Sequence, residues 1–312
     1  MTRLVLRGLA TTVAILLAAG ALVWALMLLA PVDPARQILL SQGDPAPTPA
    51  EVDATRHALG LDDGYLVQYG RWLTAAAHGD FGISWRTGDP VAAELAERLP
   101  PTIRLTLVAL LFAVVLAVAL AVPGVGNPGG GTDLAARGLV FGGSAVPSFA
   151  LGVVLLEFVV VGAGIGRVVA DGSWSGALLP AIPLAVGIGA EWARVLRGGL
   201  RDALDAPHAD TARARGSGRL RLLLLHGFPH TAAPFLTVAA MSTGGLLAGA
   251  AVIETLFTWP GVGRLLITSI DAGDLPVVQA IVLLGVIAYL AADLAARLLA
   301  AAVDPRLRSR TR

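Results

Sequence analysis

Long apolar segments alternate with shorter polar ones along most of this 312-residue chain. A helix needs about 20 mostly apolar residues to cross the hydrocarbon core of a bilayer. Six stretches are long and apolar enough: roughly 8–30, 104–123, 138–161, 177–196, 234–253 and 275–303. Continuous apolar runs of this length are typical of membrane-spanning helices rather than of amphipathic surface helices. The pattern therefore predicts an all-α integral membrane protein with six transmembrane helices.

The first apolar stretch follows two basic residues, Arg3 and Arg7, as the apolar part of a secretory signal peptide would. It is too long for a signal peptide, and no convincing small-residue cleavage site precedes Pro31. We therefore expect residues 1–30 to form a retained N-terminal transmembrane anchor helix.

Charge along the polar segments predicts the orientation of the spans. The segment 31–101 holds ten acidic residues and five arginines, whereas 197–221 holds six arginines and three acidic residues. The tail 304–312 carries four arginines against Asp304. Short arginine-rich loops resist translocation, and with six spans both basic segments fall on one side of the membrane. Both chain termini are therefore expected in the cytoplasm, with 31–101 outside it.

Composition supports the membrane assignment and removes several chemistries. The chain is 55% hydrophobic and 14% charged, with a mean hydropathy of +0.74. Lysine and cysteine are both absent, so the chain has no Walker A lysine, no disulfide and no thiolate ligand. No hydrolase or dinucleotide-binding motif occurs, and His226 and His230 have no third ligand nearby in the sequence. We therefore expect neither an enzyme nor a metal site.

Two acidic residues lie inside predicted spans, where a charge costs about 3 kcal/mol on insertion scales unless it faces protein or water. Glu157 in the third span would line a translocation path or approach the outer interface, and the sequence leaves both open. Glu191 in the fourth span is expected to pair with Arg194 rather than to line a path. Pro147, Pro180 and Pro183 each remove an intrahelical hydrogen bond, so kinks can occur in the third and fourth spans.

The basic loop at 197–233 contains a short segment with helical character. Thr211 to Arg215 can form a helix, with Asp210 favourably placed near its positive N-terminus and Gly216 ending it in a left-handed conformation. Ala212 and Ala214 are small enough for close approach by a partner, and Arg213 and Arg215 offer planar donors to carboxylates. The alternative is an arginine cluster that only sets topology.

This segment resembles the "EAA" loop of ABC importer permeases, in which a glycine follows small residues and a proline follows thirteen residues later. Gly216 and Pro229 keep that spacing. The resemblance implies a helix that docks onto a separate ATPase subunit. The residues that it assigns to coupling are Asp210, Thr211, Ala212, Arg213, Ala214, Arg215, Gly216 and Pro229.

A second distinctive segment, Glu254 to Arg264, follows the fifth apolar stretch. Phe257 and Trp259 are suited to a membrane–water interface, where the ring is buried and its polar edge stays wet. Pro260-Gly261 is typical of a turn that reverses the chain between two spans. Two hypotheses stay open for Glu254, Phe257, Trp259, Pro260 and Gly261: an interfacial anchor that orders the loop, or part of an outer gate or binding-protein contact.

Further strings occur in an order that resembles one branch of ABC importers, the dipeptide/oligopeptide/nickel permease family. They include Gly79-Asp80-Phe81-Gly82-Ile83-Ser84, Arg98-Leu99-Pro100-Pro101-Thr102, the Glu254 segment, Asp274-Leu275-Pro276-Val277-Val278-Gln279 and Asp304-Pro305-Arg306. The resemblance runs from about residue 31 to 306. The sequence departs from it in the glycine-rich loop 123–131, where relatives tend to be basic, and at Pro229-His230.

The resemblance implies the ABC importer permease fold and a role as a transport subunit in the bacterial plasma membrane. It divides the chain into the anchor helix at 1–30, an extracytoplasmic loop region at 31–101, a five-helix permease core at 102–306 with its coupling loop at 197–233, and a cytoplasmic tail at 307–312. The expected substrates are di- and oligopeptides, moved by alternating access. Transport of nickel or a metal chelate is the alternative, and an ATP-independent channel or membrane scaffold is more remote.

The resemblance also implies partners. These are a second permease subunit, identical or different, two ABC ATPase subunits that hold ATP and magnesium, an extracytoplasmic substrate-binding protein, and membrane lipid. No nucleic acid is expected, and no cofactor is expected on this chain.

Overall fold

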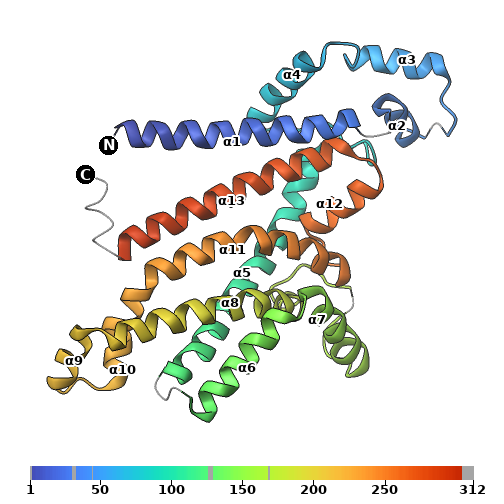
Figure 1. The fold of residues 1–312 in the computed structure, drawn as a ribbon. Helices are drawn as coiled ribbons and strands as arrows, with labels where there is room; N and C mark the ends of the chain where they lie inside the picture. Colours follow the sequence, from blue (N-terminus) through green and yellow to red (C-terminus); the bar gives the residue numbers. More distant parts are fainter. Residues whose placement is uncertain (1, 30–32, 44, 126–128, 168, 304–312) are drawn as a thin grey trace. The chain divides into compact units, whose positions relative to one another are not determined.

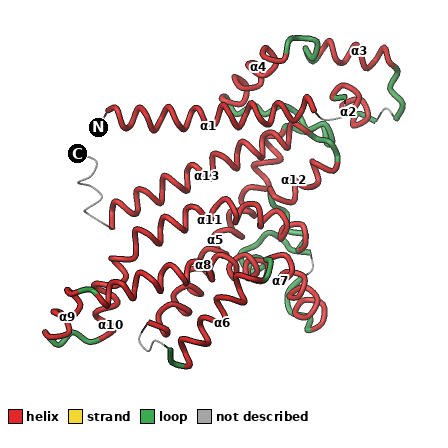
Figure 2. Tube along the Cα trace, in the orientation of Figure 1, coloured by secondary structure: helices red, strands yellow, loops and turns green. Residues whose placement is uncertain are grey.

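The computed structural model describes residues 2–29, 33–43, 45–125, 129–167 and 169–303. These residues fold almost wholly into helices, and among them no strand occurs beyond an isolated bridge between Ile83 and Pro90 (Figures 1 and 2). The expected all-α architecture is confirmed. The predicted tail at 307–312 and the Asp304-Pro305-Arg306 string lie outside the described residues.

The chain divides into two compact units, which we describe separately. The N-terminal unit comprises Thr2–Pro100 and Pro260–Ala288, and the core unit comprises Pro101–Trp259 with Tyr289–Arg312. Two helices, α5 (Val91–Val125) and α13 (Leu275–Val303), contribute residues to both units.

The N-terminal unit is helical even where the sequence predicts a loop. It contains α1 (Thr2–Leu29), α2 (Pro34–Ser41), α3 (Pro49–Ala58), α4 (Tyr65–Ala77) and α12 (Val262–Asp271). Local capping explains the short helices, because Asp33 accepts from the Ala35 N–H and Thr48 forms a capping box with Glu51. A small apolar core joins the start of α5 to α12 and α13 through Val91, Leu95, Val262, Leu265, Val277, Ala280 and Ile281.

The core unit holds the longest helices. Its elements are α6 (Gly131–Ala145), α7 (Ser148–Leu155), the π-helical segment η1 (Leu156–Gly162), α8 (Leu178–Asp205), α9 (Pro207–Ala214), α10 (Arg219–Leu222), the π-helical segment η2 (Leu223–Gly227) and α11 (Phe228–Leu256). Helices α8 and α11 lie side by side (Figure 1). On α5, buried alanines recur every fourth residue, and a Cβ on Gly189 of α8 would lie 3.1 Å from the Ala113 carbonyl oxygen. Small side chains therefore let α5 and α8 approach closely.

Four of the described helices are long and apolar enough to cross a membrane: Val91–Pro123, Leu178–Asp205, Arg219–Leu246 and Leu275–Ala296. The third predicted span, 138–161, is not one straight helix. Gly131–Ala145 and Ser148–Gly162 pass the same test together but meet at an angle of 97°. Pro147 stands at this break, so the predicted kink is confirmed and is much sharper than expected.

The first predicted span falls within α1, of which Thr11–Ala25 qualifies as a shorter apolar helix. The described residues therefore support four spans, or five if the bent pair forms one, and the count of six stays a prediction.

Candidate functional site

Helix α9 is the central element of the predicted coupling loop. It follows α8 almost without interruption, because Pro207 takes the first helical position directly after Ala206. Gly216 ends the helix at φ +82°, with its N–H donating to the Arg213 carbonyl at 2.9 Å. The Ser217 N–H donates to the Ala212 carbonyl at 3.0 Å, which completes a Schellman motif. The left-handed Gly216 is confirmed, whereas the helix begins at Pro207 rather than at Thr211.

The two faces of α9 have different surroundings. Ala209 is fully buried, and Ala212 packs against an apolar cluster formed by Leu196, Leu200, Leu204, Leu222, Leu223, Ala121 and Val125. Ala212 thus faces the core of this unit, which differs from the expected role in partner contact. Asp210, Thr211, Ala214, Arg215 and Gly216 are exposed. The surface of α9 that is open to a partner is therefore small and polar, around Ala214.

The two predicted arginine donors are used differently. Arg213 donates to Asp210 Oδ1 and to the Leu204 carbonyl oxygen, both at 2.7 Å. Its guanidinium thereby joins α9 to a carbonyl of the last turn of α8. Arg215 is exposed and forms no ion pair within the described part of the chain. Arg213 thus stabilises the connection between α8 and α9, and Arg215, the C-cap residue of α9, is available to another molecule.

Apolar side chains are exposed immediately after α9. Leu220, Leu224 and Leu225 project from α10 and η2 around a shallow groove of about 580 Å³. Pro229 is the second residue of α11 and directly follows the π-helical segment η2, so it lies within a continuous helical run that begins at Arg219. The predicted loop is thus a chain of short helices rather than an irregular segment.

The fold brings a third histidine to the pair at 226 and 230. The ring of His208 on α9 lies 5.8 Å from that of His226 and 6.5 Å from that of His230, measured between centroids. No spacing pattern predicts this neighbour, because eighteen or more positions separate His208 from the pair. Even so, no group of three or more histidine, aspartate or glutamate side chains in the described residues is arranged to hold a metal ion.

The predicted aromatic residues at the end of α11 are buried, which contradicts the interfacial-anchor hypothesis. Phe257 and Trp259 expose 1% and 0% of their surface and belong to the apolar core formed by α5, α8 and α11. Glu254 is also fully buried and accepts a hydrogen bond from the Thr102 hydroxyl at 2.7 Å. The aromatic rings therefore fill the protein interior rather than a membrane–water boundary, since helical packing surrounds them on all sides.

Helix α11 ends in an unusual backbone conformation. Thr258 has φ +50° and is the one non-glycine residue with positive φ in the described ranges. The Trp259 N–H donates to the Glu254 carbonyl at 2.7 Å and the Thr258 N–H to the Thr255 carbonyl at 3.3 Å, a second Schellman motif. Pro260 follows, and Gly261 forms the N-cap of α12, so the predicted turn at Pro260-Gly261 is confirmed.

The loop 163–177 packs beside this end of α11. The Ala170 N–H donates to the Phe257 carbonyl at 3.3 Å, and Arg104 donates to the Gly172 carbonyl at 2.9 Å. Asp171 accepts from the Ser173 hydroxyl at 2.6 Å and from the Ser173 N–H at 3.0 Å. The hydroxyl bond, followed by the N–H bond, lowers the pKa of the Asp171 carboxyl below its ordinary value.

The two acidic residues of the predicted spans are both exposed in this chain. Glu157 lies in η1, beyond the bend at Pro147. Glu191 lies on α8, and the expected ion pair with Arg194 is not among those that the described residues form. Neither side chain is buried against its own chain, so exposure of Glu157 is compatible with both a translocation path and the outer interface.

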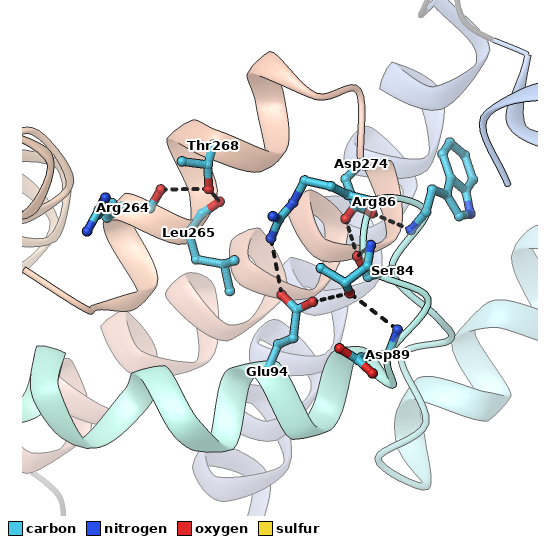
Figure 3. Close-up of polar contacts among 10 residues, drawn as sticks. Ser84, Arg86, Asp89, Glu94, Arg264, Leu265, Thr268 and Asp274 are labelled. Carbon is cyan, nitrogen blue, oxygen red and sulfur yellow. Dashed lines mark hydrogen bonds and ion pairs between the residues drawn. The ribbon is translucent and has the colours of Figure 1, made fainter. Parts of the chain in front are cut away.

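A polar network in the N-terminal unit joins two of the strings that suggested the family. The Ser84 hydroxyl donates to Asp274 Oδ2 at 2.5 Å, and the Trp85 N–H donates to Asp274 Oδ1 at 3.0 Å (Figure 3). Asp274 is fully buried, so these donors replace the water that its carboxylate would otherwise bind. The contact between the two strings is not predictable from the sequence, because 189 positions separate Trp85 from Asp274.

A buried ion cluster in the core unit is not predicted from the sequence. Asp133, in the first turn of α6, is fully buried and contacts the guanidinium groups of Arg137, Arg197 and Arg201. The Gly129 N–H also donates to Asp133 Oδ2 at 3.0 Å. These contacts connect the end of the glycine-rich loop to α8. The sequence holds a weak signal for them, since Arg197 and Arg201 are one turn apart on a helix.

Comparison with known proteins identifies the class of molecule. Residues 109–309 match the family described as binding-protein-dependent transport system inner membrane component, and residues 1–106 match its N-terminal membrane component. The chain therefore belongs to the permease family of peptide/nickel ABC importers.

Individual relatives match over almost their whole length. The glutathione transport system permease protein GsiC of Salmonella paratyphi A is 35% identical over 309 residues, which is 99% of each chain. The protein of the same name from Escherichia coli K12 is 32% identical over 308 residues, again 99% of each chain. As a permease of this family, the chain is a multi-pass inner-membrane transport subunit, and ATP binds on partner ATPases. Family membership also implies a partner permease and a binding protein.

Proposed function

We propose that this chain is the permease subunit of an ATP-driven importer that moves short peptides across the cytoplasmic membrane by alternating access. The observation that carries the proposal is α9, a short helix with one face fixed to its own unit and the other exposed. A stiff, exposed helix between two long apolar helices is what a separate ATPase needs in order to act on the spans.

The packing of α9 supports its role as the coupling helix. Ala209 and Ala212 are held against side chains of α5, α8 and η2, and Arg213 joins α9 to the end of α8. A displacement of α9 would therefore move several long helices together, because close-packed interiors transmit movement rather than absorb it. Asp210, Thr211, Ala214, Arg215 and Gly216 form the proposed ATPase-facing surface, with Pro229 at the far end of the loop.

The membrane arrangement belongs to the same proposal. We assign six spans, with α1 as the first and the bent pair α6–α7–η1 as the third. Both termini and the α9 loop are placed in the cytoplasm, because the arginine-rich segments then share one side. Residues 31–101 lie outside, where a substrate-binding protein docks. Glu157 is assigned to the translocation path, and the Glu254–Gly261 segment to the outer gate.

The substrate class rests on similarity. Relatives covering almost the whole chain are named glutathione transport permeases, and glutathione is a small peptide. We therefore favour short peptides, with nickel or a metal chelate as the alternative within the same architecture. The complex would contain a second permease, two ATPases and a binding protein.

Uptake assays separate the candidate substrates. A strain that lacks the whole importer is complemented with all subunits, and uptake of labelled glutathione, labelled dipeptides and labelled nickel is measured side by side. Peptide or glutathione uptake that disappears with ATPase-inactive partners is the expected result. Uptake of nickel without peptide uptake would mean that the substrate is a metal or its chelate. Uptake that persists with inactive ATPases would indicate a channel instead.

Cross-linking tests the coupling surface separately. Because the chain has no native cysteine, single cysteines can be placed without background. Ala214→Cys, which is exposed on α9, should cross-link to a cysteine in the ATPase subunit, whereas Ala209→Cys, which is buried on the same helix, should not. Equal cross-linking at both positions, or at neither, would contradict docking through this face.

A further inference from the structure

The basic cluster of α6 and α8 consists of Asp133, Arg137, Arg197 and Arg201. One fully buried carboxylate faces three guanidinium groups: Arg137 at 2.9 Å, Arg201 at 3.4 Å, and Arg197 on the other carboxylate oxygen. Positive charge is therefore in excess around Asp133. The nearest acidic residues on α8, Asp202 and Asp205, are exposed and form no ion pair within the part of the chain that the structure describes.

The arginines differ in how far they reach the surface. The side chain of Arg197 is mostly buried, that of Arg201 is partly exposed, and that of Arg137 is 55% exposed. Arg197 and Asp133 form the buried base of the cluster, and Arg137 is its most exposed guanidinium, with one nitrogen on Asp133. An arginine fork of this kind matches the geometry of a phosphate group.

An apolar surface begins directly beside Arg137. Leu134, Leu139 and Phe141 on α6 are all exposed, and Leu134 and Phe141 lie one turn to either side of Arg137 on the same helix face. Helix α6 is one half of a bent pair that is long and apolar enough to cross a membrane, so lipid is the expected neighbour of these exposed side chains. Arg137 thus places a positive charge within an exposed apolar face, about two turns from the start of α6.

We infer that this cluster binds the phosphate of an acidic phospholipid, whose acyl chains lie along the exposed face of α6. Charge complementarity selects an anion, and the adjoining Leu134 and Phe141 select one that carries hydrocarbon. Arg137 contacts the phosphate, while Arg197, Arg201 and Asp133 hold the two helices in place. A basic pocket between helices at the end of a span is a recognised arrangement for such headgroups.

The test uses the whole importer in nanodiscs of phosphatidylcholine mixed with phosphatidylglycerol. Lipid that stays bound after transfer to detergent is counted by native mass spectrometry. The complex should retain phosphatidylglycerol in preference to phosphatidylcholine. Arg137→Gln should lower this retention about fivefold, the effect of one basic charge at a membrane surface. Arg137→Lys should retain part of it.

Arg167→Gln is the matched control, because Arg167 is likewise exposed and pairs with an aspartate four residues away. It should leave retention unchanged. Thermal unfolding in phosphatidylcholine alone should stay cooperative for Arg137→Gln, because Arg197 and Arg201 still pair with Asp133, and this excludes a folding defect. No preference for phosphatidylglycerol, or equal loss in both variants, would overturn the inference.

Two further results would also overturn it. If inorganic phosphate raises the unfolding temperature in phosphatidylcholine discs as much as phosphatidylglycerol does, the ligand is a free anion. If Arg137→Cys cross-links to the partner permease, a protein surface covers the cluster instead.

Discussion

Helices α9 and α11 end in the same backbone motif, but different forces hold it there. In both, the residue after the C-cap is left-handed and the next N–H donates back to the carbonyl five residues earlier. In α9 that left-handed residue is Gly216, which is exposed and would have no atom within 4 Å of an added Cβ. In α11 it is Thr258, which lies between the fully buried Trp259 and the almost fully buried Phe257.

The difference separates local from tertiary control of structure. Glycine adopts positive φ at little cost, so α9 ends where its own sequence dictates. A β-branched residue in that conformation is strained, and it persists only where the surroundings over-determine it. Around Thr258 those surroundings are the aromatic core, the Thr102–Glu254 hydrogen bond and the bond from Ala170 to Phe257. Removing them one by one tests this interpretation.

The largest effect is expected for Trp259→Ala. Loss of a fully buried indole leaves a cavity and should cost about 3–5 kcal/mol of stability. Thermal unfolding of the purified importer in detergent measures it. Trp259→Phe is the control, because it keeps an aromatic ring and the buried indole N–H has no hydrogen-bond partner among the described residues, so the smaller cavity should cost clearly less than in Trp259→Ala. Similar losses in both variants would mean that packing does not hold this end of α11.

Thr102→Val should come next. It removes the hydroxyl that donates to Glu254 at 2.7 Å and leaves a fully buried carboxylate with one donor fewer. A loss of about 1–3 kcal/mol is expected, because a buried acceptor pays the desolvation cost of the missing bond. Thr102→Ser keeps the hydroxyl and should stay close to wild type in the same unfolding assay. A stable Thr102→Val protein would show that this bond does not secure the end of α11.

These two ends also show what the sequence can and cannot predict. The glycine at 216 predicts a left-handed helix end, and Pro147 predicts a break, because both act through their own backbone. Thr258 predicts extended structure instead, and Phe257 and Trp259 suit a wet interface as well as a core. Their burial depends on helices distant in the sequence. The same holds for Asp133 and Arg197, which are brought together only by the packing of α6 on α8.

Gly216→Val should act on α9 without disturbing the core. Space is available for the side chain, so the cost is backbone strain of about 1–2 kcal/mol at the left-handed position. This strain should loosen the last turn of α9. ATP-driven uptake should fall several-fold while the amount of protein in the membrane stays constant. Gly216→Asn, which tolerates this conformation better, should keep most of the uptake. Unchanged uptake in Gly216→Val would remove the helix end from the coupling mechanism.

Thr258→Gly should give a smaller effect of the opposite sign. It relieves the strain at φ +50° but loses side-chain contacts, so a gain of about 0.5–1 kcal/mol is expected. Thr258→Val loses the hydroxyl and keeps the strain, so it should be less stable than wild type. The unfolding temperature should therefore be highest for the glycine variant, intermediate for wild type and lowest for the valine variant. A glycine variant that unfolds first would show that Thr258 is not strained.

The smallest expected effect is a pH dependence confined to the surroundings of Thr258. The pKa of Asp171 is lowered in the folded protein, first by the Ser173 hydroxyl and then by the Ser173 N–H. A lowered pKa means that this contact stabilises the loop above the ordinary carboxyl range and is lost as pH falls through the folded value. The loop contacts the end of α11 through Ala170, so acid should loosen both the loop and this helix end.

Hydrogen exchange measures the loosening as a protection factor, which should fall as the medium is acidified at the amides of Ser173 and Trp259. The amide of Ser217 donates to the Ala212 carbonyl at the end of α9, where the carboxylate contact from Asp210 to Arg213 is solvent-exposed, so its protection should change less. In Ser173→Ala the loop should be less protected at neutral pH and respond less to acid. Equal acid sensitivity at Trp259 and Ser217 would mean that the two helix ends do not differ in the way their packing indicates.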